Sequence, residues 1–123
     1  MIGLSQFEKW MLADLRKPPD VTRLSGQTFS GDSQANLIGV TVTNGGESVE
    51  LTGNIVGYII KPDGGMITVS GSKSGNRAWI VLPEEAYLSY GEITVSICEE
   101  TTNTKTTLAV CVGTVYKATI PIE

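Results

Sequence analysis

The second half of the chain alternates between apolar and polar positions with a period of two. Ile93, Val95 and Ile97 alternate with polar neighbours, and residues 77–82 repeat the pattern earlier in the chain. This period places successive side chains on opposite faces of a β-strand, so that one face can pack on a core. Strands are predicted at residues 37–43, 48–51, 54–60, 66–69, 77–82, 92–98 and 106–116, with short extended pieces at 21–24 and 28–29.

Turn residues separate these segments. Lys61-Pro62-Asp63-Gly64 is typical of a turn in which proline presets φ and glycine takes the left-handed position. Pro83, followed by two glutamates, predicts one helical turn. Residues 54–60 are apolar on both faces, which indicates a central strand. Short strands at regular spacing predict an all-β fold, an immunoglobulin-like antiparallel β-sandwich.

The N-terminal segment carries a different pattern. Ser5 and Glu8 match a capping box, and Pro18 would end a helix that starts there. We therefore expect an amphipathic helix over residues 4–17. A lone helix of this length is marginal in water, so its apolar face should dock either on its own sandwich or on a neighbouring subunit. The predicted interface residues are Leu4, Phe7, Trp10, Met11 and Leu15. The expected domains are residues 1–19, a helical anchor, and residues 20–123, the sandwich.

Length and charge narrow the function classes. The chain has 123 residues, enough for one domain with its own core, and its net charge is −4. The acidic excess lies in residues 25–123, whose balance is −5, and an acidic body repels phosphate backbones. No apolar run approaches the roughly 18 residues of a membrane-spanning helix, and no signal peptide is visible. We expect neither nucleic-acid binding nor membrane insertion, and synthesis in the cytoplasm.

The two cysteines are expected to stay unlinked. Cys98 and Cys111 lie on consecutive predicted strands, and hairpin pairing would place Cys98 opposite roughly residue 106. The remaining offset separates the two Cα atoms by about 15 Å, whereas a disulfide needs less than about 7 Å. Two free, buried thiols suit a reducing compartment.

Candidate chemistry is sparse. The chain has no histidine, which removes the commonest general base and metal ligand. The pairs Glu84-Glu85 and Glu99-Glu100 are adjacent in sequence, so their side chains point apart. We expect no catalytic site, cofactor or metal. One alternative class stays open: a carbohydrate-binding module whose surface is lined by Tyr87, Tyr90 and Tyr116.

The order of these segments resembles the N-terminal domain of phage baseplate upper proteins, and similar domains open phage tail-fibre and head-fibre proteins. The resemblance spans roughly residues 21–117 and rests on residues 51–53, 61–64, 81–87 and 91–92, with upstream pieces at 21–23 and 29–33.

The resemblance implies an immunoglobulin-like domain without enzymatic activity that anchors a fibre to the virion. It implies other virion proteins of the capsid or tail, and copies of the chain itself, as partners, with a host-surface glycan as a further one. The predicted N-terminal helix departs from the family pattern, which suggests an anchor or oligomer contact. The expectation is therefore a virion structural protein, on the head, a head fibre or the tail baseplate, that is assembled in the bacterial cytoplasm and takes part in assembly or host attachment.

Overall fold

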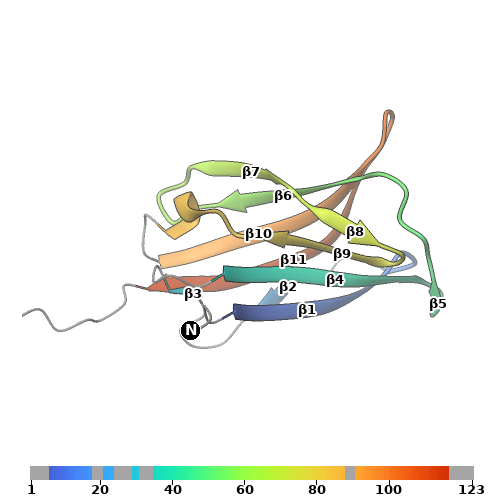
Figure 1. Cartoon of the computed structure of the whole chain (residues 1–123), viewed down its shortest axis with the longest axis horizontal. Coiled ribbons are helices and arrows are strands. Elements are labelled where there is room, and N and C mark those ends of the chain that lie inside the picture. Colours follow the sequence, from blue (N-terminus) through green and yellow to red (C-terminus); the bar gives the residue numbers. More distant parts are fainter. Residues whose placement is uncertain (1–5, 18–20, 24–28, 31–34, 88–90, 117–123) are drawn as a thin grey trace, which may run out of the picture.

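The computed structural model describes residues 6–17, 21–23, 29–30, 35–87 and 91–116. They form a β-sandwich of two mixed sheets, which are seen stacked in Figure 1. Sheet A has five strands: β1 (Gln6–Asp14), β4 (Ala35–Asn44), β5 (Glu47–Ser48), β8 (Ser72–Ser74) and β9 (Arg77–Val81). Sheet B has six: β2 (Val21–Arg23), β3 (Phe29–Ser30), β6 (Asn54–Ile60), β7 (Met66–Ser70), β10 (Gly91–Glu100) and β11 (Lys105–Tyr116).

The predicted β-sandwich is confirmed, but the predicted N-terminal helix is wrong. Residues 6–14 form strand β1, which pairs in parallel with β4 along its whole length and lies beside it in Figure 1. Apolar side chains stand at both helical and strand spacing here, so the sequence pattern alone fits either element. Pairing decides, because the strand gains backbone hydrogen bonds and buries Met11, whereas an isolated short helix is marginal.

The sheets are also mixed rather than wholly antiparallel. β1 runs parallel to β4, and both β2 and β3 run parallel to β11. The remaining pairs are antiparallel, in the order β1-β4-β9-β8 for sheet A and β2-β11-β10-β6-β7 for sheet B. β6 therefore lies between β10 and β7, which confirms its prediction as an interior strand.

The core follows the period of two. Ile38, Val40 and Val42 of β4 are fully buried and face Ile93, Val95 and other buried residues of sheet B. The intervening residues face outward, as the alternating burial along β6, β9 and β10 shows. The alternation predicted from the sequence is thus the division between core and outer faces.

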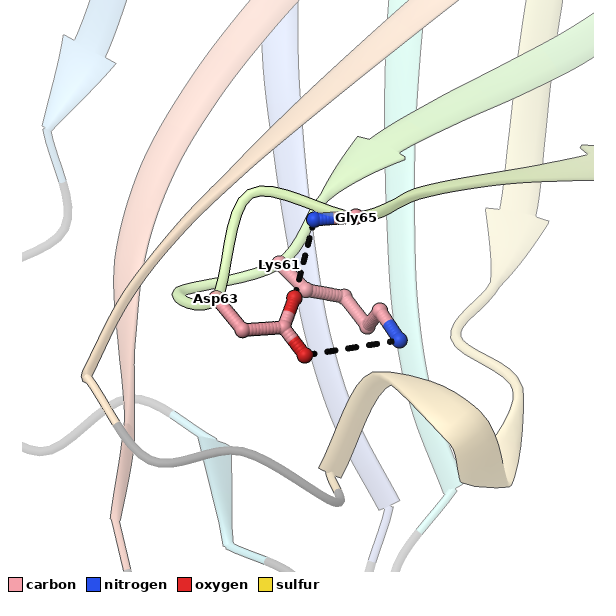
Figure 2. A network of polar contacts seen from close by, with 3 residues as sticks. All are labelled: Lys61, Asp63 and Gly65. Carbon is pink, nitrogen blue, oxygen red and sulfur yellow. Dashed lines mark hydrogen bonds and ion pairs between the residues drawn. The ribbon is translucent and has the colours of Figure 1, made fainter.

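The turn between β6 and β7 has the predicted geometry (Figure 2). Gly64 has a φ of 92°, which glycine adopts without steric cost. One Asp63 carboxylate oxygen accepts a hydrogen bond from the Gly65 amide at 2.8 Å, and the other lies 3.8 Å from the Lys61 ammonium. The turn therefore fixes the register of the hairpin and places the Lys61 ammonium near the Asp63 carboxylate.

The turn after Pro83 and the two cysteines agree with their predictions. The turn after Pro83 is a 3-10 helix at Glu84–Tyr87. Cys98 lies opposite Thr107, and both cysteines are free and buried, as predicted. The sequence reasoning missed β8, which lies between the strands predicted at residues 66–69 and 77–82. Within the described residues, no helix has the length and apolarity to cross a membrane.

Candidate interaction face

Both tryptophans of the chain lie on the outer face of sheet A instead of in the core. In the register of the sheet Trp10 stands beside Gly39, and Gly39 stands beside Trp79. The two indole rings meet edge to face, with centroids 6.1 Å apart and an interplanar angle of 61°. Both side chains are partly exposed. Large aromatic side chains that are exposed to solvent often anchor protein–protein interfaces.

Gly39 makes this arrangement possible. A Cβ atom at position 39 would overlap the six-membered ring of Trp10. The ring therefore lies flat against the backbone of β4, between its own strand and β9. A residue with a side chain here would lift Trp10 away from the sheet and separate it from Trp79.

Arg77 lies over the Trp10 ring. Its guanidinium carbon lies 4.3 Å from the ring centroid, which is cation–π geometry. Arg77 is exposed, and among the described residues no carboxylate lies within ion-pair distance of it. A guanidinium stacked on a ring keeps its in-plane N–H donors available, so Arg77 can bind a carboxylate bidentately.

Apolar side chains border this cluster. Leu12 is 88% exposed and stands in the row of Arg77, and Val81 is 49% exposed at the end of β9. We call the set Leu12, Trp10, Trp79, Arg77 and Val81 the tryptophan face. It combines apolar contact area with one cation that has no acidic partner among the described residues.

Asp14 fixes the edge of the tryptophan face. Its two carboxylate oxygens accept hydrogen bonds from the amides of Arg16, Gly45 and Gly46 and from the Thr43 hydroxyl, at 2.9–3.0 Å. These donors, with Gly45 and Arg16 foremost, hold the pKa of Asp14 well below its usual value of 3.8. Asp14 thereby ties the end of β1 to the turn between β4 and β5, and it is not available to neutralise Arg77.

A groove of about 450 Å³ runs along the same end of the sandwich. Its walls are the end of β1, with Met11 and Leu15, and the start of β11, with Leu108. Threonine residues line much of the remainder, together with the titratable residues Asp14 and Lys17. Within the described part of the chain, no three His, Cys, Asp or Glu side chains gather as metal ligands would.

The thiol of Cys111 lies inside the sandwich, on the inner face of β11. Burial raises its pKa to about 11, so the thiol stays protonated at neutral pH. The buried, protonated thiol suits a packing role.

The residues predicted as an interface are separated by the strand. Trp10 faces outward on the tryptophan face, whereas Met11 is 5% exposed and packs in the core. Leu15 follows β1 and lines the groove. Phe7 lies in β1 opposite Asn36, but its side chain, like Leu4, is outside the described residues. Tyr90 and the side chains of Tyr87 and Tyr116 are outside them too.

The sequence reasoning missed Trp79 and Arg77 as interface candidates. A signal was present, because both stand on the polar phase of an alternating strand whose other phase is Ala78 and Ile80. A tryptophan on the outward phase of a strand indicates a contact surface.

Comparison with solved structures finds chains of similar fold, among them a phage domain. The chain matches "N-terminal domain of phage TP901-1 ORF48" with a TM-score of 0.53 and 10% sequence identity. The match covers 90% of this chain and 98% of the other. At this identity the likeness is one of fold. No protein-family model matches the chain, and no curated protein matches it by sequence.

Proposed function

We propose that the chain is a non-enzymatic structural protein of a bacteriophage virion, a sandwich module that attaches to the particle or decorates it. The observation that carries the proposal is the fold match to a phage domain over nearly the whole length of both chains. Two buried, unlinked thiols support assembly in a reducing bacterial cytoplasm. The site on the particle is the head, a head fibre or the tail baseplate.

The tryptophan face is the proposed attachment surface. Sugars stack on an aromatic ring whose face is open, but the Trp10 ring packs close to Gly39 and has the Arg77 guanidinium over it. Trp79 is inclined at 61° to Trp10, so the two rings form no shared platform. This geometry favours a protein partner over a glycan.

Charge defines that partner further. Arg77 offers N–H donors with no acid beside it among the described residues, and Leu12 and Val81 border it with apolar area. A complementary surface presents a carboxylate flanked by apolar side chains. Such a contact is partly electrostatic, so salt should weaken it.

The first test is immunogold electron microscopy of purified particles with an antibody against the recombinant chain. Label over the head supports a decoration or head-fibre role, and label at the tail tip supports a baseplate role. Particles that carry no label contradict the virion proposal.

The attachment surface is tested with a matched pair of variants. Arg77→Glu reverses the cation of the tryptophan face, and Lys17→Glu reverses an exposed lysine that follows β1 and lies outside that face. We expect Arg77→Glu to reduce incorporation into particles at least about tenfold, since it sets two acids against each other, and Lys17→Glu to leave it within about twofold. Equal incorporation of both variants would remove the tryptophan face from the proposal.

A further inference from the structure

The outer face of sheet B is a second apolar surface, on the opposite side of the molecule from the tryptophan face. In one row of the sheet, Met66, Ile60, Thr94, Val112 and Arg23 are successive register neighbours across β7, β6, β10, β11 and β2. The next row holds Thr68, Tyr58, Ser96, Val110 and Val21. We call these two rows the valine face.

The valine face is exposed at Met66, Ile60 and Val21 in the single chain, whereas Val112 is 8% exposed. Met66 is 64% exposed, Val21 54% and Ile60 47%, although all three are large apolar side chains. An antiparallel sheet with one solvated face normally carries polar residues there. β6 instead is apolar on both faces, although one of these faces is on the outside of the sandwich. Exposed apolar side chains that lie together on one face indicate a contact surface.

The charges around the valine face cancel in pairs. Arg23 lies 3.6 Å from Glu92 at one end. At the adjoining turn Lys61 lies 3.8 Å from Asp63 (Figure 2).

At the opposite end, the Tyr58 hydroxyl donates to the Glu100 carboxylate while the Lys105 ammonium lies 3.9 Å from the centre of the Tyr58 ring. Among the described residues, each of the three cations around the face therefore has an acid in the same group of side chains. The two rows themselves carry no charged residue other than Arg23.

We propose that the valine face binds the valine face of a second copy of this chain, in a two-fold symmetric dimer. In a two-fold dimer the same surface of each copy contacts the other copy, so this surface must be self-complementary. A face whose charges cancel locally meets itself without opposing like charges. The tryptophan face does not meet this condition, because its single cation, Arg77, has no acid beside it among the described residues.

The test is sedimentation equilibrium of the purified full chain over a wide range of concentration. The wild-type chain associates to twice its monomer mass. Ile60→Lys places a charge in the apolar contact beside Met66 and raises the dissociation constant at least about tenfold.

Val81→Lys is the matched control. Val81 is 49% exposed, against 47% for Ile60, and each residue is the last of its strand, on opposite sides of the sandwich. Val81→Lys leaves the dissociation constant within about twofold. Met66→Lys on the edge strand β7 serves as a second disrupting variant, and far-UV circular dichroism shows that each variant is folded.

Concentration-dependent dimers that Ile60→Lys or Met66→Lys dissolves, and Val81→Lys does not, support the proposal. A wild-type chain that is monomeric throughout overturns it, and so does equal disruption by Val81→Lys. Because the measurement uses the purified chain alone, its result is separate from that of particle labelling.

Discussion

The carboxylate of Asp14 ties the end of β1 to the turn between β4 and β5. Asp14 accepts four hydrogen bonds, three of them from backbone amides, and these bonds favour its charged form. The sequence gives little warning of this, since the partners Gly45 and Gly46 stand some thirty positions away. The parallel pairing of β1 with β4 brings the acid to the turn that needs an acceptor.

Replacing this carboxylate should change the response of stability to pH. In the unfolded chain Asp14 titrates near a pKa of about 3.9, and in the folded protein the pKa is lower. Its stabilising effect is therefore fully present above the unfolded value and is lost as the pH falls through it toward the folded value. We expect Asp14→Asn to be less stable than the wild type at pH 7, with the difference shrinking from about pH 5 downward.

Urea unfolding of both proteins at pH 7 and pH 3 measures this. Glu47→Gln is the control, because Glu47 is an exposed acid in the same turn region, is not one of the four hydrogen-bond partners of Asp14, and should match the wild type at both pH values. A difference between Asp14→Asn and the wild type that stays constant with pH would show that the clamp does not depend on the charge.

At the scale of elements, β1 shows how one segment can satisfy two patterns. Phe7, Met11 and Leu15 are at helical spacing, and a proline pair follows, so a helix was a reasonable prediction. Along a strand the same segment presents Lys9, Met11 and Ala13 to one side and Trp10 and Leu12 to the other. The open edge of β4 decides between them, since it supplies nine residues of pairing that no local signal in the segment reveals.

Adjacent residues of β1 should differ sharply in their effect on stability. Met11 is buried and Leu12 is 88% exposed. Met11→Ala should lower the free energy of unfolding by about 2 kcal/mol or more, because it removes buried methylenes and leaves a cavity. Leu12→Ala should change it by less than about 0.5 kcal/mol. Chemical denaturation of the two variants measures both values, and equal costs would contradict the strand register.

At the scale of the whole molecule, the sandwich presents two unlike apolar faces. The tryptophan face carries a cation, Arg77, that has no acidic partner among the described residues, and we propose that it binds an acidic surface of a different protein. The valine face is locally neutral and fits a copy of itself. A module with these two faces can pair with its own kind while each member of the pair keeps its attachment surface outward.

The two contacts should therefore respond differently to mutation and to salt. Arg77→Glu should leave dimerisation of the purified chain unchanged, because Arg77 lies on the other sheet. Raising the ionic strength should weaken particle attachment, where a charge pair contributes, and leave the apolar dimer intact or stronger. Parallel sedimentation and incorporation measurements in low and high salt would show it, and dimers that dissolve with salt would contradict the assignment of the faces.

The sequence by itself determined the sandwich, most strand positions, the turn at residues 61–65 and the unlinked thiols. These features depend on the alternation of apolar residues and on turn chemistry, both of which act between near neighbours. Tertiary structure decided that residues 6–14 are a strand, that two strands of sheet B run parallel to β11, and that Trp10, Trp79 and Arg77 meet over Gly39. Those outcomes depend on pairing between segments far apart in the chain, where the free energy of burial and hydrogen bonding exceeds local preference.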